Sequence, residues 1–155
     1  MMGRFLKFGT VSQRHSKSFG VMPFTLTKEG KTDIILKGLS NPFYADDIRQ
    51  FQVIDPDKKI FNDLGAKILS YEIVDDDKKA EPALAAVRIS DEIVGTQFHP
   101  EADAEEFILR IRIYKYAGYF RPEEAEELSA AIRESHTPVP REILRRFIDR
   151  YRSEK

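Results

Sequence analysis

The pattern of apolar and polar positions changes along the chain and predicts strands in the first part and helices in the last part. Residues 1–8 have the spacing of an amphipathic helix, and Gly9 suits the left-handed residue that follows a helix. From residue 10 to residue 98, short β-prone runs are separated by turn residues, as in Lys-Glu-Gly-Lys at 28–31. The predicted strands cover residues 10–12, 19–27, 33–36, 48–54, 66–72, 83–89 and 93–98.

Two smaller features interrupt or end this β-rich part. Residues 57–64 place Ile60, Phe61 and Leu64 on one side, which predicts a short helix. The last two predicted strands are joined by Ser-Asp-Glu, which indicates a hairpin or two strands with a tight loop.

Three helices are predicted after Glu101. The first covers residues 104–117, although residues 111–116 also alternate like a strand. Its apolar face consists of Phe107, Ile108, Ile111 and Tyr114. The second helix begins at Pro122, and the third covers residues 140–151. We therefore divide the chain into a first part, residues 1–117, and a helical extension, residues 118–155.

The charge distribution bears on possible partners. The third helix has a basic face made of Arg141, Arg145, Arg150 and Arg152. Such a face usually keeps a helix soluble, and binding of nucleic acid or of an acidic partner is the alternative. The formal net charge of -1 gives the whole molecule no preference for nucleic acid or an anionic membrane, so we expect neither as a partner. The N-terminus has no signal-peptide pattern, and no apolar run reaches the roughly 20 residues that cross a bilayer, so we expect a cytoplasmic protein.

Composition limits the available chemistry. A chain of 155 residues with 41% apolar residues is the size of one globular domain. The absence of cysteine excludes disulfides, thiolate metal sites and a cysteine nucleophile within this chain. There is no glycine-rich phosphate loop, and no third ligand is spaced near His99 and Glu101. We therefore expect neither a cofactor nor a metal ion.

The sequence Gly-Thr-Gln-Phe-His-Pro-Glu at residues 95–101 is the strongest chemical signal in the chain. A predicted strand ends at His99, and Pro100 holds the residue before it extended. Glu101 can bond one imidazole nitrogen if the chain turns through Pro100, which leaves the other nitrogen free to take a proton from a nucleophile. Taken alone, His-Pro-Glu is a weak signal, and a surface turn is the alternative.

The same seven residues resemble the signature that closes the class I glutamine amidotransferase domain, in which Gly-x-Gln-Phe-His-Pro-Glu supplies His and Glu of a Cys-His-Glu triad. Other segments occur in the order seen in amidotransferase domains similar to that of GMP synthase. These are Ser-Lys-Ser-Phe-Gly-Val-Met-Pro at 16–23, Gly-Leu-Ser-Asn-Pro-Phe-Tyr-Ala at 38–45, Arg-Gln-Phe-Gln-Val at 49–53 and Leu-Gly-Ala-Lys-Ile-Leu-Ser at 64–70. The resemblance covers residues 1–107 and implies an α/β fold, the C-terminal part of a flavodoxin-like three-layer domain.

The resemblance also implies roles for particular residues. His99 would take the proton of a cysteine thiol and deliver it to the leaving ammonia, and Glu101 would orient His99. Ile48 and Arg49 align with the segment whose backbone contacts the substrate, L-glutamine, while a surface charge is the alternative for Arg49. The ammonia would pass to a synthetase partner, either a domain or a subunit. The helix at residues 1–8 resembles the end of the helix after the nucleophile, so the cysteine would lie upstream of this chain.

Two other functions remain open. A non-catalytic binding module could keep the scaffold without its nucleophile, as a homo-oligomer that covers an open sheet edge. A γ-glutamyl hydrolase would use the same triad without a synthetase. Ser12, Ser16 and Ser18 do not lie in a Gly-x-Ser-x-Gly elbow and do not replace the cysteine. We interpret His15, His136 and the acidic run at 75–77 as surface features.

Overall fold

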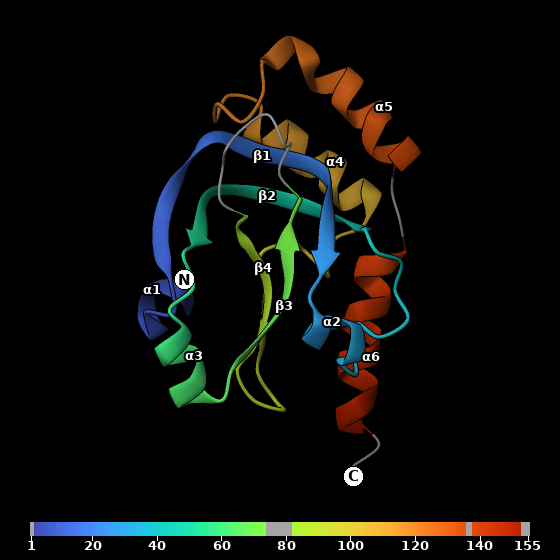
Figure 1. The fold of residues 1–155 in the computed structure, drawn as a ribbon. Coiled ribbons are helices and arrows are strands. Elements are labelled where there is room, and N and C mark those ends of the chain that lie inside the picture. Colours follow the sequence, from blue (N-terminus) through green and yellow to red (C-terminus); the bar gives the residue numbers. More distant parts are fainter. Residues whose placement is uncertain (1, 74–81, 136–137, 153–155) are drawn as a thin grey trace.

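The computed structural model describes residues 2–73, 82–135 and 138–152. The chain forms an α/β fold around one sheet, with helices packed against it (Figure 1). The strands are β1 (Thr10–Leu26), β2 (Phe43–Ile54), β3 (Lys67–Glu72), β4 (Leu84–Arg88) and β5 (Val94–Thr96). The helices are α1 (Met2–Leu6), α2 (Lys28–Thr32), α3 (Lys58–Leu64), α4 (Ala104–Tyr114), the 3-10 turn η2 (Pro122–Glu124), α5 (Ala125–Ser135) and α6 (Val139–Arg152).

The sheet has the strand order β2-β1-β3-β4-β5, and every neighbouring pair among the described strands is antiparallel. Strand β1 is long and pairs with β2 along most of its length, with a register shift between Gln13 and Ser18. Strands β1 and β2 bend across one end of β3 and β4 (Figure 1). Bulges of this kind increase local bending, so the irregular part of β1 fits the curvature of the sheet.

Three groups of buried side chains hold the helices to the sheet. The largest includes Phe24, Phe43 and Phe98 from the sheet segments and Ile143 from α6. A second group joins Phe19 of β1 to α4 and α5, and its buried members are Phe19, Ala102, Phe107, Ile108, Ile111 and Ile132. A third joins Phe8 and Phe61 to Val53, Leu84 and Val87. The strand β4 is buried at all of its positions, as expected for a strand with helices over both faces.

Most predicted elements are present, but several predictions need correction. The predicted strands at 10–12 and 19–27 are parts of the single strand β1. The turn predicted at 28–31 belongs to helix α2, because the Thr27 hydroxyl accepts a hydrogen bond from the backbone of Gly30 and caps the helix. The left-handed residue after α1 is Lys7, with φ of 57°, and not Gly9. The strand alternative for 111–116 is wrong, since α4 continues to Tyr114.

The strand predicted at 33–36 is a series of turns. The carboxylate of Asp33 accepts a hydrogen bond from the backbone of Ile35, and the Asp33 carbonyl accepts one from Lys37. Asp33 is also held by two hydrogen bonds from Arg88. Ile35 and Leu36 are nevertheless buried, so their apolar character reflects core packing and not a strand.

The helices after residue 117 pack into two of the three buried groups described above. Ile132 of α5 packs in the group that contains Phe19, and Ile143 of α6 packs in the group that contains Phe98. The boundary between 117 and 118 stays a prediction, but these contacts join the two parts closely. His136 and the acidic run at 75–77 lie outside the described residues.

Candidate functional site

The segment that carries His99 is anchored by a buried phenylalanine. Phe98 is 2% exposed, and its ring lies 5.3 Å from that of Phe24 and 5.6 Å from that of Phe43, measured between centroids. One residue earlier, the Gln97 backbone N–H donates to the Ala85 carbonyl at 2.8 Å and extends the pairing of β5 with β4. His99 is therefore the first residue after a segment that is fixed by both packing and backbone bonds.

His99 also joins this segment to the other end of the sheet. Its backbone N–H donates to the carbonyl of Asp46 in β2, at 2.9 Å. The strands β5 and β2 are the first and last in the strand order, so the curved sheet brings its two edges together at this hydrogen bond. The backbone N–H of Ala102 then donates to the His99 carbonyl at 3.3 Å, which closes a turn through Pro100.

This turn places Glu101 against the imidazole of His99. The distance from His99 Nδ1 to Glu101 Oε1 is 2.7 Å. In the neutral ring, Nδ1–H donates to the carboxylate, and Nε2 keeps its lone pair. Nε2 has no hydrogen-bond partner among the residues that the structure describes. The side chains of His99 and Glu101 are 27% and 50% exposed, so solvent and a ligand can reach the pair.

The environment of Glu101 favours its charged form. Burial raises the pKa of this carboxyl, but hydrogen bonds from His99 and from the Glu101 backbone N–H, with the charges of His99 and Arg110, outweigh burial. The pKa of Glu101 is therefore lowered from its ordinary value of 4.5. An ionised glutamate at neutral pH fixes the tautomer of the histidine that it contacts.

Ile48 lies on the same edge of β2 that holds His99. Backbone N–H and C=O groups of alternate residues point to the same edge of an antiparallel strand. Because the Asp46 carbonyl points outward to His99, the backbone groups of Ile48 point outward too, about 7 Å further along the strand. No hydrogen bond from these groups to a residue beyond the sheet is present in the described part of the chain. The backbone groups of Ile48 therefore face away from β1, on the side of β2 where His99 is bound.

Arg49 differs from Ile48, because its backbone groups do not point to this outer edge of β2. Its backbone faces β1, where it pairs with Ser18, and its side chain is buried. Arg49 Nε donates to Asp47 at 2.8 Å, and its Nη2 donates to Glu72 in β3 at 2.6 Å. The alternative that Arg49 is a surface charge is therefore wrong, since its residue is only 6% exposed.

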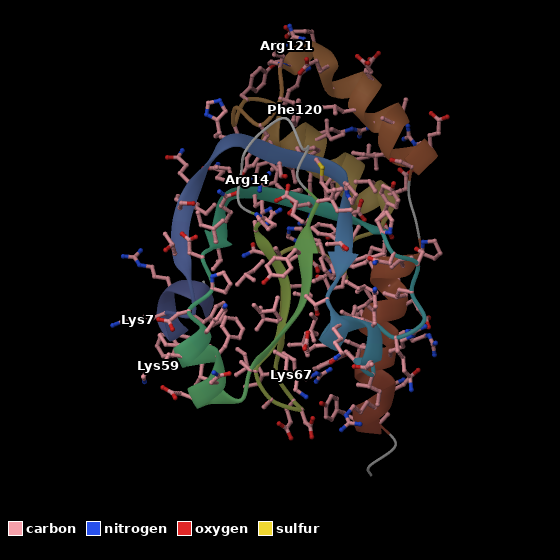
Figure 2. The ribbon with its side chains drawn as sticks, viewed as in Figure 1. Lys7, Arg14, Lys59, Lys67, Phe120 and Arg121 are labelled. Atoms are coloured by element: carbon pink, nitrogen blue, oxygen red, sulfur yellow. The ribbon has the colours of Figure 1, made fainter. Side chains whose placement is uncertain are left out.

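The buried cluster around Arg49 spans three strands, and we call Arg14, Asp47, Arg49 and Glu72 the β-sheet clamp. Arg14 of β1 makes two hydrogen bonds to Glu72, at 2.7 and 2.8 Å. Burial raises the pKa of Asp47, and the charge of Glu72 adds to this, while Arg49, the Ser18 hydroxyl and Arg14 lower it; the net shift is upward. Figure 2 shows Arg14 over the sheet, whereas Lys7 and Lys59 extend from the periphery.

The clamp was not predicted from the sequence. Its members lie at positions 14, 47, 49 and 72, in segments that also carry other charged residues. The signal that could have drawn attention to it is the pair Asp47 and Arg49, which stand two residues apart at the start of the strand predicted at 48–54 and would therefore point to the same face of it. Their partners on other strands are fixed by tertiary structure and carry no local pattern.

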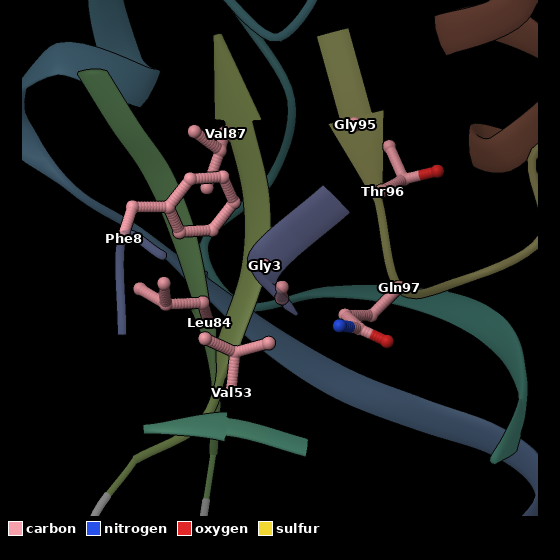
Figure 3. Close-up of a pocket in the computed structure, with 9 residues that line it drawn as sticks. Gly3, Phe8, Val53, Leu84, Val87, Gly95, Thr96 and Gln97 are labelled. Atoms are coloured by element: carbon pink, nitrogen blue, oxygen red, sulfur yellow. The ribbon is translucent and has the colours of Figure 1, made fainter. Parts of the chain in front are cut away.

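A cavity of about 170 Å³ lies beside residues 95–97, the residues that lead to His99 (Figure 3). Phe8, Val53, Leu84 and Val87 line one side of it. Gly3, Gly95, Thr96 and Gln97 complete much of the lining, and none of the lining residues is titratable. The acid–base groups of the candidate site therefore lie outside this cavity, beyond Gln97.

The described residues contain neither a membrane-spanning helix nor a metal-binding group of side chains. Among these residues, no helix has the length and hydrophobicity of a membrane span. The same part of the chain holds no group of three or more His, Cys, Asp or Glu side chains that could bind a metal ion.

Comparison with known proteins finds likeness in structure only. The chain is similar to the crystal structure of SMU.1228c, with a TM-score of 0.61 and 18% sequence identity. The match covers 96% of this chain and 58% of that chain, so this chain spans little more than half the length of that protein. At this identity the likeness shows the fold alone. No family model and no curated protein matches the sequence.

Proposed function

We propose that this chain supplies the histidine and glutamate of a class I glutamine amidotransferase domain. The observation that carries the proposal is the His99–Glu101 contact of 2.7 Å, which occupies Nδ1 and leaves Nε2 without a partner among the described residues. It occurs within the motif Gly-Thr-Gln-Phe-His-Pro-Glu, which resembles the family signature. The flavodoxin-like fold belongs to this proposal, because its parallel strands would come from a segment that is not part of these 155 residues.

The chemistry would use His99 as both base and acid. His99 Nε2 takes the proton of a cysteine thiol from the other segment, and the thiolate attacks the side-chain amide carbon of L-glutamine. The carbon–nitrogen bond breaks when the imidazolium returns this proton to the leaving amine, which departs as ammonia. Water, deprotonated by Nε2, then hydrolyses the thioester to glutamate and the free thiol. Glu101 holds the imidazole in the required tautomer and stabilises its charged form.

The edge of β2 offers a binding surface for the substrate. The outward backbone groups of Ile48 can donate to and accept from the amino-acid end of L-glutamine, next to His99. The side chain of Arg49 would not contact the substrate, because its guanidinium is held by Asp47 and Glu72. Its part would be to support β2 from inside the protein. Ammonia would pass to a synthetase domain or subunit.

The test is ammonia release from L-glutamine by a polypeptide that joins this chain to the cysteine-bearing segment that the proposal requires. We expect His99→Ala to lower kcat by about a thousand-fold or more, because a triad member acts as part of a unit. His15→Ala is the matched control, since His15 is an exposed histidine, and it should leave the rate unchanged. Equal rates for the two variants would refute the proposal.

One observation favours a second function, a binding module without catalysis. The 155 residues contain no cysteine, so the chain by itself has no thiolate for this reaction. In that case the edge of β2 would bind a ligand such as glutamine without turnover. Calorimetric titration of this chain with L-glutamine separates the two functions, because a binding module binds tightly alone, whereas half of an active site does not.

A further inference from the structure

Among the described residues, Arg110 of α4 is the lysine or arginine that lies within 4 Å of the Glu101 carboxylate. Its Nη2 lies 3.8 Å from Glu101 Oε1, which is the same oxygen that contacts His99 Nδ1. The same nitrogen donates to Glu106 at 2.9 Å. The side chain of Arg110 is 23% exposed, so this guanidinium lies partly within the protein surface.

The start of α4 explains how Arg110 reaches back to Glu101. The carboxylate of Asp103 accepts a hydrogen bond from the backbone of Glu106 and begins the helix two residues after Glu101. Helical side chains tilt toward the N-terminus of their helix, so Arg110 extends past Glu106 toward the preceding turn. The turn that places Glu101 on His99 thus also places Glu101 within reach of Arg110.

Other charged groups near Glu101 are already in ion pairs or lie across a shallow hollow. Arg141 of α6 is paired with Asp103, and Arg145 is paired with Glu142 and Asp149. The hollow is lined by Glu101, Arg141, Leu144, Arg145, Ile148, Asp149 and Arg152. On β2, Asp46 contacts His99 through its backbone carbonyl. Arg110 is the cation that shares an oxygen of Glu101 with the histidine ring.

We propose that Arg110 is a positioning residue that divides the charge of Glu101 between itself and His99, and so limits how strongly Glu101 favours the imidazolium form over the neutral form that accepts a proton. This inference rests on the proposed function, because only a general base must be neutral before the reaction. A glutamate that contacts histidine alone favours the imidazolium, which cannot take a proton from a thiol. A second cation at the same carboxylate opposes that effect.

Glu106 sets the strength of this interaction. It holds the guanidinium of Arg110 at a shorter distance than Glu101 does, which limits how far Arg110 neutralises Glu101. Two variants of neighbouring residues on α4 therefore act in opposite directions. Loss of Arg110 removes a positive charge near His99, and loss of Glu106 removes a negative charge.

The experiment is an NMR titration of the histidine rings in the whole 155-residue chain, with the His99 signal identified by its loss in His99→Gln. We expect Arg110→Gln to raise the titration midpoint of the His99 ring by a few tenths of a pH unit, because it removes a positive charge that shares an oxygen of Glu101 with the ring. Arg110→Lys keeps the charge and should stay close to the wild type, and Glu106→Gln should lower the midpoint. A lowered or unchanged midpoint in Arg110→Gln would overturn the proposal.

Glu101→Gln separates this inference from the proposed function. Loss of the contacting carboxylate should lower the His99 midpoint by about 1 pH unit. If this happens and Arg110→Gln has no effect, the His99–Glu101 pair stands and the role of Arg110 is wrong. If Glu101→Gln has no effect either, the pair does not form in solution, and the proposed function loses its main support.

Discussion

Two clusters of paired charges contact strand β2, and they differ mainly in how far their side chains are buried. The β-sheet clamp joins Arg49 to Asp47 at 2.8 Å and to Glu72 at 2.6 Å, with the side chains 5%, 0% and 10% exposed. The His99–Glu101 pair has a similar separation of 2.7 Å, but Glu101 is half exposed. The separation of the atoms therefore does not distinguish the buried ion pairs from the exposed His99–Glu101 pair. Burial commits every charge of the clamp to a partner inside the protein, whereas the exposed pair keeps one ring nitrogen free.

The two clusters are also mechanically related. The clamp holds Asp47 and Arg49 on one face of β2, and the Asp46 carbonyl of the same strand accepts a hydrogen bond from His99 and fixes the backbone of the segment that carries it. Gly20 and Ser18 of β1 lie opposite Asp47 and Arg49, and the arginine side chain reaches across β1 to Glu72 of β3. We interpret the clamp as the support that keeps the edge of β2 against His99.

The largest expected effect comes from breaking the clamp. Arg49→Met keeps most of the side-chain volume but leaves Asp47 and part of Glu72 without the cation that they contact. We expect a loss of about 3–5 kcal/mol in the free energy of unfolding, as when one partner of a buried ion pair is removed. Urea unfolding followed by circular dichroism measures it.

Lys59→Met is the matched control for that variant. Lys59 pairs with Asp63 at 2.7 Å, but the two side chains are 83% and 61% exposed. An exposed pair four residues apart on a helix contributes about 0.3–0.5 kcal/mol. Similar losses in the two variants would contradict the contrast between buried and exposed charges.

A smaller effect should appear in the pH dependence of stability. The pKa of Asp47 is raised in the folded protein, chiefly by burial. The folded state then binds more protons than the unfolded state above the ordinary value of 3.8, so this residue lowers stability as pH rises toward its folded pKa. In Asp47→Asn this contribution is absent. We expect the free energy of unfolding of the variant, relative to wild type, to increase with pH above about 4, the unperturbed aspartate value. A constant difference across the acid range would show that Asp47 titrates normally.

The smallest effect on stability is expected at the candidate site. Glu101→Gln should change the free energy of unfolding by less than about 1 kcal/mol, because the carboxylate is half exposed. The pKa of Glu101 is lowered, so whatever the pair contributes is present above the ordinary value of 4.5 and is lost as pH falls through the folded pKa. Urea unfolding at pH 7 and pH 3 tests both statements. A loss as large as that of Arg49→Met would mean that Glu101 has a structural role.

Features set by neighbouring residues could be predicted from the sequence, and features set by distant contacts could not. The helix at 57–64 was predictable because Asp57 caps it, accepting hydrogen bonds from the backbone of Lys59 and Ile60, and Gly65 ends it with a left-handed conformation. The turn at Pro100 was predictable because proline ends a strand and leaves Glu101 two residues from His99. Each of these features is encoded within a few neighbouring residues.

Features that depend on distant contacts were not predictable. Ile35 and Leu36 resemble a strand because they are apolar, but Asp33 and its bonds to Arg88 turn the chain there. Arg49 looked like either a surface charge or part of a substrate segment, and only its contact with Glu72, 23 residues away, shows that it is buried. The bond from His99 to Asp46 depends on the curvature of the whole sheet, which no local pattern encodes.

The central claim is that His99 and Glu101 form one part of a cysteine-dependent active site. The most direct measurement is to determine the DNA sequence that precedes the codon of Met1 and to translate it in the same frame. We expect strands that lead to a Gly-x-Cys elbow shortly before residue 1, in position to place a thiol near Nε2 of His99. An upstream sequence without such a cysteine would contradict the claim and favour a binding module at the edge of β2.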